Sequence, residues 1–173
     1  MGKTPHITRK VFPFILYSAM KDNIPSQGEP ACVLLQDQTA ASARILVVED
    51  DIDVRHLNLE VLIGSGYQVD AAADGAAAWD ALIADSYDLM ITDNNMPKLT
   101  GVELLKKLRS ARMELPVIMA TGVLPTEEFA RCPWLQPAAT LVKPYTVDAL
   151  LEKVKAVLRA ANSEPAQLEP PPE

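Results

Sequence analysis

The chain contains five short stretches rich in apolar residues, and a polar or charged residue follows each of them. These stretches are residues 45–48, 67–73, 89–91, 116–120 and 140–142. Their length and their content of Val, Ile and Leu are typical of strands that are buried on both faces of a parallel sheet. The pattern therefore predicts five strands, and a region between each strand and the next in which helices are expected.

Apolar residues between and after the strands recur at helical spacing, and polar residues give start and stop signals. Asp74 is a candidate N-cap, and Thr100 with Glu103 has the form of a capping box. Pro133 and Pro137 are expected to shorten the helix that begins at Thr126. The apolar positions that share a helix face are Val54, Leu57, Val61 and Leu62, then Trp79, Leu82 and Ile83, then Val102, Leu105 and Leu108, and finally Val147, Leu150, Leu151, Val154, Val157, Leu158 and Ala161.

Strands that alternate with helices define the fold class. Five strands and five helices within residues 44–161 predict an α/β domain with one doubly wound, five-stranded parallel sheet. Residues 1–43 are expected to form an N-terminal extension and linker, because Pro, Gly, Gln and Ser are frequent there. Residues 162–173 are expected to be a disordered tail, because they are rich in Pro and Glu and contain no basic residue.

Charge and cysteine content narrow the class of protein. A net charge of −7 argues against a general nucleic-acid-binding surface. The apolar run at residues 11–20 is too short to span a bilayer, and no clear cleavage site follows it. Cys32 and Cys132 lie far apart without metal-binding spacing, so we expect two free thiols in a cytoplasmic protein.

Chemically reactive side chains follow the ends of four strands. Glu49 and Asp50 follow the first strand, Asp93 the third, Thr121 the fourth and Lys143 the fifth. Because the carboxyl ends of parallel strands share one edge of the sheet, these side chains are expected to meet in one cleft. Three carboxylates about 4 Å apart repel by about 4 kcal/mol per pair at an effective dielectric constant of about 20, so they require a cation. Mg²⁺ suits such oxygen ligands, and Lys and Thr suit phosphate oxygens, which together indicates phosphoryl transfer at an aspartate.

The same residues resemble the receiver domain of two-component response regulators. The matching pieces are residues 47–51, Asp93 with Met96 and Pro97, residues 121–122 and residues 143–144. The spacing also matches, since 43 positions separate Asp50 from Asp93, 28 separate Asp93 from Thr121, and 22 separate Thr121 from Lys143. The resemblance covers residues 44–161 and implies a single receiver domain with the flavodoxin-like strand order 2-1-3-4-5.

The resemblance implies a role for each residue that matches. Asp93 would accept a phosphoryl group from a phosphohistidine on a sensor histidine kinase or a phosphotransfer protein, and Thr121 and Lys143 would hold that group. The bond between Lys143 and Pro144 would be cis. The signal would pass to a downstream protein, and the sequence does not identify that protein or decide whether the chain forms a homodimer.

The resemblance also implies a magnesium site. The side chains of Asp50 and Asp93 and the backbone carbonyl of Asn95 would bind Mg²⁺ directly, and Glu49 would act through a bound water. An aspartyl phosphatase is the main enzymatic alternative, but its Asp-x-Asp-x-Thr or -Val motif is absent, because the nearest match, residues 51–55, ends in Arg55. No separate catalytic or DNA-binding output domain is expected from the residues outside 44–161.

The sequence departs from the family pattern in the fourth helix, which Pro133 and Pro137 make irregular, and at one position of the fifth strand. Thr140 stands where receivers often carry a Tyr or Phe that turns inward as a switch, and Tyr145 does not replace that aromatic residue in the strand alternation. A degenerate receiver that acts as an interaction module without phosphorylation therefore remains the alternative function.

Overall fold

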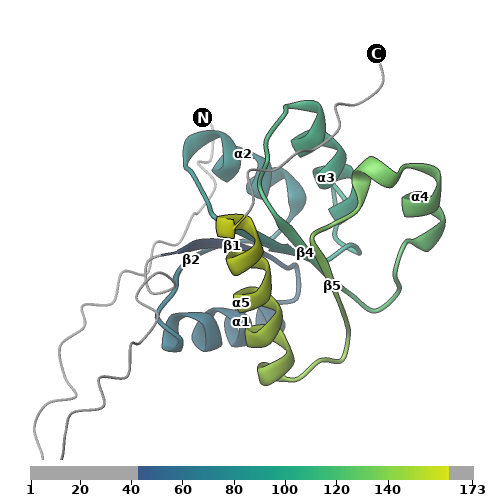
Figure 1. Ribbon diagram of the computed structural model, residues 1–173. Helices are drawn as coiled ribbons and strands as arrows, with labels where there is room; N and C mark the ends of the chain where they lie inside the picture. Colours follow the sequence, from purple (N-terminus) through teal and green to yellow (C-terminus); the bar gives the residue numbers. More distant parts are fainter. Residues whose placement is uncertain (1–42, 164–173) are drawn as a thin grey trace, which may run out of the picture.

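The computed structural model describes residues 43–163, which form a five-stranded parallel sheet with helices on both faces (Figure 1). The strand order is β2-β1-β3-β4-β5, which confirms the predicted doubly wound topology. The elements in chain order are β1 (Arg44–Val48), α1 (Ile52–Gly64), β2 (Gln68–Ala72), α2 (Gly75–Ala84), β3 (Leu89–Thr92), α3 (Gly101–Ser110), β4 (Val117–Thr121), α4 (Thr126–Arg131), the 3₁₀ helix η1 (Pro133–Leu135), β5 (Ala139–Val142) and α5 (Val147–Ser163).

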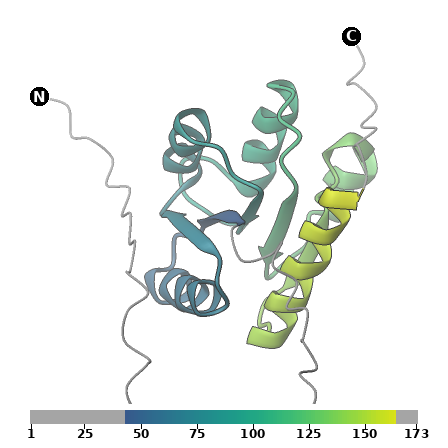
Figure 2. The ribbon, with the colours of Figure 1, turned by 60° about the vertical axis from the view of Figure 1, so that its left-hand side comes forward.

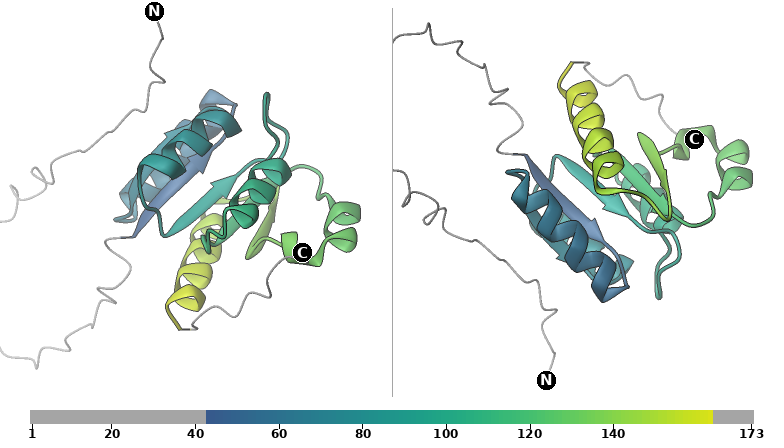
Figure 3. Two further views of the ribbon diagram at one scale, coloured as in Figure 1. Left: turned by 90° about the horizontal axis from the view of Figure 1, so that it is seen from above. Right: turned by 90° about the horizontal axis from the view of Figure 1, so that it is seen from below.

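Two apolar clusters pack against the two faces of the sheet. Helices α1 and α5 supply one cluster, which includes Leu62 and Val154, and helices α2 and α3 supply the other, which includes Leu82 and Leu105. Figure 2 shows α1 and α2 on opposite sides of the sheet, and Figure 3 views the two helix pairs from above and from below. Every residue of β3 and β4 is buried, as the continuous apolar runs predict.

Helix starts follow the predicted capping residues. The Asp74 side chain accepts hydrogen bonds from the backbone N–H groups of Ala76 and Ala77, and Thr100 and Glu103 form the complete capping box of α3. Helix α4 ends after Arg131 because Pro133 begins a separate 3₁₀ turn, so the predicted irregularity is confirmed.

Details of the predicted pattern differ from the structure at a few positions. Leu57 and Ile83 were expected on inward helix faces, but they are 54% and 67% exposed. In α1 the fully buried residues are Asn58 and Leu62, so the inner face is rotated relative to the apolar pattern.

The end of the domain also differs from the prediction, because helix α5 continues to Ser163, beyond the predicted boundary at Ala161. The predicted extension up to position 42 and the tail from position 164, together with Cys32, lie outside the described residues, and Cys132 is a free cysteine.

Backbone hydrogen bonds place the residues that follow three strands. The N–H of Glu49 donates to the carbonyl of Ala72 at 3.1 Å, and the N–H of Asp93 donates to the carbonyl of Val48 at 3.0 Å. The N–H of Lys143 donates to the carbonyl of Thr121 at 3.0 Å. Each bond continues the parallel ladder by one residue, so the sheet itself sets the positions of these residues.

Gly101 generates a testable prediction about the loop after β3. A Cβ atom there would be closer to the carbonyl oxygen of Asp93 than ordinary packing allows, and it would lie 3.0 Å from the Cα atom of Asn94. We therefore expect Gly101→Ala to lower the free energy of unfolding by about 1–3 kcal/mol, as overpacking does in other cores. Urea unfolding measures the change.

The matched control is Gly64→Ala at the end of α1, where an added Cβ meets no atom within 4 Å. This substitution is expected to leave stability unchanged or to raise it by up to about 1 kcal/mol, because Ala has the higher helix propensity. Equal losses in both variants would contradict the steric explanation.

Candidate functional site

Three carboxylates lie together at the carboxyl edge of the sheet. Glu49 and Asp50 follow β1 and Asp93 follows β3, the neighbouring strand, and one oxygen from each of them lies within 4.8 Å of the other two. Glu49 and Asp93 are buried, with exposed fractions of 2% and 8%, and Asp50 is exposed to solvent. The structure thus brings together the three acidic side chains that the sequence predicted to meet.

The ammonium group of Lys143 lies between two of these carboxylates. Its Nζ atom is 2.7 Å from Oε2 of Glu49 and 2.7 Å from Oδ2 of Asp93. Lys143 directly follows β5, and its side chain reaches these two carboxylates across the strands that lie between β5 and β1. One ammonium among three carboxylates leaves the cluster with an excess of negative charge, which a divalent cation in contact with oxygen ligands would neutralise. The chemistry of this donor set therefore fits Mg²⁺.

Burial and ion pairing have opposite effects on the pKa values of Glu49 and Lys143. Burial raises the pKa of Glu49, and the hydrogen bond and charge of Lys143 offset only part of that rise. Burial also lowers the pKa of Lys143, but its hydrogen bonds to Asp93 and Glu49 outweigh this, so the pKa of Lys143 is raised overall. Lys143 therefore stays protonated as the cation that balances the buried acids.

The loop after Asp93 orients its carboxylate. Oδ1 of Asp93 accepts hydrogen bonds from the backbone N–H groups of Asn94 and Asn95, the latter at 3.1 Å, while Oδ2 faces Lys143. The side-chain oxygen of Asn94 in turn accepts a hydrogen bond from the N–H of Val102 at 3.1 Å, at the start of α3. Asn94 therefore ties the Asp93 loop to α3, a role that sequence reasoning did not assign to it.

Arg55 organises the other acidic loop. Its Nη1 atom donates to the backbone carbonyls of Glu49 at 2.6 Å and Asp50 at 3.1 Å. The neighbouring Asp51 caps α1, because its side chain accepts from the N–H groups of Asp53 and Val54, and these backbone hydrogen bonds lower its pKa. The sequence did not single out Arg55 for this contact, since one exposed-looking Arg in a first helix turn carries no specific signal.

Thr121 and Asn95 occupy the same sheet edge as the carboxylates. Thr121 is fully buried at the end of β4, and its hydroxyl donates to the carbonyl of Val123 at 3.2 Å. Asn95 is joined to Asp93 through its backbone N–H. The bond between Lys143 and Pro144 is cis, as the resemblance implies.

Tyr145 makes a contact that the sequence did not predict. Its hydroxyl accepts a hydrogen bond from Nδ2 of Asn58 at 3.0 Å and donates to Oδ1 of the same residue at 3.3 Å. The side chain thus faces α1 from a position two residues after Lys143, while Thr140, at the position of the family's aromatic residue, is half-buried in β5.

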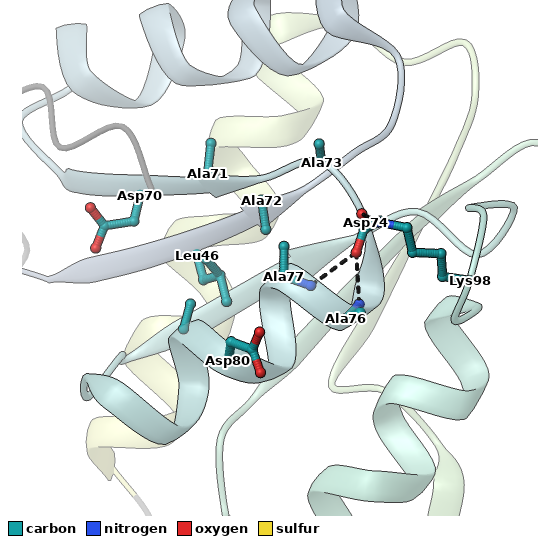
Figure 4. Close-up of a pocket in the computed structure, with 11 residues that line it drawn as sticks. Leu46, Asp70, Ala71, Ala72, Ala73, Asp74, Ala76, Ala77, Asp80 and Lys98 are labelled. Atoms are coloured by element: carbon teal, nitrogen blue, oxygen red, sulfur yellow. Dashed lines mark hydrogen bonds and ion pairs between the residues drawn. The ribbon is translucent and has the colours of Figure 1, made fainter. Parts of the chain in front are cut away.

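A separate groove of about 390 Å³ lies between β2 and α2 (Figure 4). Alanine side chains of both elements line it, together with the charged side chains of Asp74, Asp80 and Lys98. Nζ of Lys98 is 2.6 Å from Oδ2 of Asp74, the residue that caps α2. The three clustered carboxylates do not line this groove, so it is distinct from the candidate site.

Comparison with known proteins assigns the fold and the acidic edge to a family. The family model of the response regulator receiver domain matches residues 45–155. The response regulator MprA of Mycobacterium bovis is 37% identical over 127 residues, which cover 72% of this chain and 54% of that protein. MprA of Mycobacterium tuberculosis is 36% identical over 127 residues with the same coverage. The chain thus spans about half the length of the curated relatives it matches.

Solved receiver structures superpose on the same region. The chemotaxis response regulator CheY4 of Vibrio cholerae matches with a TM-score of 0.61 and 32% identity, covering 67% of this chain and 98% of that one. TrrA of Thermotoga maritima, solved in complex with Mg²⁺ and BeF, matches with a TM-score of 0.58 and 32% identity, covering 66% and 98%. The chain belongs to the response regulator receiver domains of two-component systems.

Among residues 43–163, the helices fall short of the length and apolar character needed to cross a membrane.

The ion pair at the centre of the site gives a prediction about stability. Lys143→Met removes the cation from the buried Glu49, whose side chain is 3% exposed, and should lower the free energy of unfolding by about 3 kcal/mol near neutral pH. Without the ammonium, the folded-state pKa of Glu49 rises further above its unfolded value. A raised carboxyl pKa favours the folded state at low pH, and that benefit is lost as the pH rises through the folded-state pKa. The deficit is therefore expected to be larger at about pH 8 than at about pH 5 in urea unfolding.

Lys98→Met is the matched control, since Lys98 also pairs with an aspartate but its side chain is 67% exposed. Its loss is expected to cost less than about 1 kcal/mol, with little change between the two pH values. A pH-independent deficit in Lys143→Met would contradict the role assigned to Glu49.

Proposed function

We propose that this receiver domain accepts a phosphoryl group on Asp93 from a phosphohistidine of a histidine kinase or phosphotransfer protein. The observation that supports this most directly is the contact of Lys143 with both Glu49 and Asp93 beside a third carboxylate, Asp50. A buried carboxylate whose orientation is held by a lysine and by two backbone N–H groups is a preorganised nucleophile.

The proposed step is a direct transfer of the phosphoryl group from nitrogen to oxygen. A carboxylate oxygen of Asp93 attacks phosphorus, the phosphorus–nitrogen bond of the phosphohistidine breaks, and the electron pair of that bond stays on the departing imidazole. Lys143 and the hydroxyl of Thr121 then hold oxygens of the transferred group, and Lys143 compensates the added negative charge. Later attack by water on phosphorus releases inorganic phosphate and restores the carboxylate.

We also propose that the domain binds Mg²⁺ at this cluster of carboxylates. The side chains of Asp50 and Asp93 and the carbonyl of Asn95 would hold the ion directly, with Glu49 acting through a water molecule. The ion would supply charge neutralisation at the phosphoryl oxygens during transfer. Support comes from the donor set within 4.8 Å and from the similar TrrA, which was solved with Mg²⁺ and BeF.

The output of the domain is proposed to be a contact with a downstream protein in the cytoplasm. Phosphorylation would shift an existing equilibrium of the surface near β4 and β5, which the partner then reads. Thr140 supports the alternative of an interaction module that needs no phosphorylation, because a small half-buried side chain takes the place of the aromatic switch. The absence of a nucleic-acid partner remains a prediction from the net charge of the chain.

Intact-mass analysis tests the phosphoacceptor. After incubation with a small phosphodonor and Mg²⁺, the wild-type chain is expected to gain one phosphoryl group, and Asp93→Asn is expected to gain none because the nucleophilic oxygen is lost. Asp80→Asn, an exposed aspartate in α2, is the control and should label like wild type. Labelling of Asp93→Asn would reject this acceptor, and a wild-type chain that stays unlabelled by the phosphodonor with Mg²⁺ present would favour the phosphorylation-independent module.

A pair of neighbouring aspartates tests the magnesium site. Asp50→Ala is expected to raise the Kd for Mg²⁺ by about tenfold or more, because a direct carboxylate ligand is removed. Asp51→Ala should keep the wild-type Kd but lower the urea midpoint of unfolding, because Asp51 caps α1. Isothermal titration with Mg²⁺ and urea unfolding separate the two effects, and equal affinities in both variants would exclude Asp50 as a ligand.

A further inference from the structure

Asn58 is a buried polar residue within an apolar layer. It is 3% exposed on the face of α1 that packs against the sheet, and Leu62 is the other fully buried residue of that helix. A buried amide needs hydrogen-bond partners, because an unpaired one pays its full desolvation cost. The partner is the hydroxyl of Tyr145, which exchanges two hydrogen bonds with the Asn58 amide.

This contact joins α1 to the short segment that carries Lys143. On the strand side, that segment is anchored by the bond from the N–H of Lys143 to the carbonyl of Thr121 at 3.0 Å. On the helix side, the Tyr145 ring packs against the apolar cluster shared by α1 and α5, and its hydroxyl reaches Asn58. Pro144, between the two anchors, is exposed. Lys143 therefore lies between one backbone anchor and one side-chain anchor.

The hydroxyl of Tyr145 also lies within the electrostatic field of the site. Burial raises its pKa most strongly and the hydrogen bond from Asn58 lowers it, while the charges of Lys143, Glu49 and Asp93 contribute as well. The charged groups of the site therefore act on the Tyr145 phenol electrostatically, while its hydroxyl is hydrogen-bonded to Asn58.

We propose that Tyr145 is a positioning residue that acts through Asn58. Its hydrogen bonds to Asn58 hold the segment of Lys143 so that the Lys143 ammonium group bridges Glu49 and Asp93. The proposal rests on the proposed phosphorylation of Asp93 for its effect on rate, but the position of Lys143 is measurable without it. A lysine side chain has many rotamers, and two simultaneous contacts at 2.7 Å require a fixed backbone origin. Small displacements of such a group reduce transfer rates strongly.

The test separates positioning from simple stabilisation by means of a double substitution. Tyr145→Phe removes the hydroxyl and leaves the Asn58 amide buried without this partner, so it should lower both stability and rate. Adding Asn58→Leu replaces the polar pair with an apolar pair of similar shape, which is expected to restore most of the stability. Because the polar link is still missing, the rate of Mg²⁺-dependent phosphorylation by a small phosphodonor should stay about fivefold to tenfold below wild type in both variants.

Tyr87→Phe is the matched control. Its hydroxyl also donates a hydrogen bond to a buried residue, Asp70, at 3.0 Å, but Tyr87 precedes β3 and so lies at the opposite end of that strand from Asp93. The loss of a tyrosine hydroxyl at that place is expected to leave the phosphorylation rate unchanged.

NMR of the Lys143 ammonium group gives a readout that does not depend on phosphorylation. The wild type and Tyr87→Phe should show a slowly exchanging Nζ signal that reports the two ion pairs, and both Tyr145→Phe and the double variant should show it shifted or broadened. An unchanged ammonium signal overturns the inference, and so does a double variant whose rate recovers together with its stability. If the wild type accepts no phosphoryl group, the proposed function fails, while the NMR comparison still decides the role of Tyr145.

Discussion

Two buried carboxylates share one ammonium group at the edge of the sheet, and the arrangement of the site depends on this sharing. Glu49 and Asp93 could not both lie beside each other as ionised groups in the protein interior without a compensating cation. Lys143 supplies that charge through contacts of 2.7 Å to each of them. Under the proposed function, the side chain that compensates the acids would also bind the anionic phosphoryl group.

This sharing requires that strands distant in sequence end at the same level. Glu49, Asp93 and Lys143 each donate a backbone N–H to the last residue of a neighbouring strand, so the parallel ladder sets their relative heights. The loops contribute finer orientation. Arg55 holds the carbonyls after β1, and Asn94 connects the Asp93 loop to α3. The site is therefore built on rigid elements, with a second layer of polar contacts behind the reactive groups.

Two structural features of this domain depart from the pattern of the family. Thr140 replaces the usual aromatic residue in β5, and α4 is a single short helix that ends before Pro133. On the opposite side of the sheet, Tyr145 and Asn58 link the Lys143 segment directly to α1. This domain thus has a polar connection from the Lys143 segment to α1, the helix whose capping residue Asp51 directly follows Asp50.

The sequence by itself determined the fold class, the acidic cluster and the helix caps, because these follow from local signals. Continuous apolar runs define parallel strands, and right-handed crossovers place all their carboxyl ends at one edge. Only the tertiary structure decided which face of α1 points inward. Leu57 is exposed and Asn58 is buried although the apolar pattern favours the reverse, because the angle at which α1 packs on the sheet selects the inner face and a partner 87 positions away makes a buried amide tolerable. The contact of Tyr145 with Asn58 was unpredictable for the same reason, because it depends on a distance between separate elements. The contacts of Arg55 and Asn94 join residues five to eight positions apart, and they depend on loop conformations that the residue types alone do not specify.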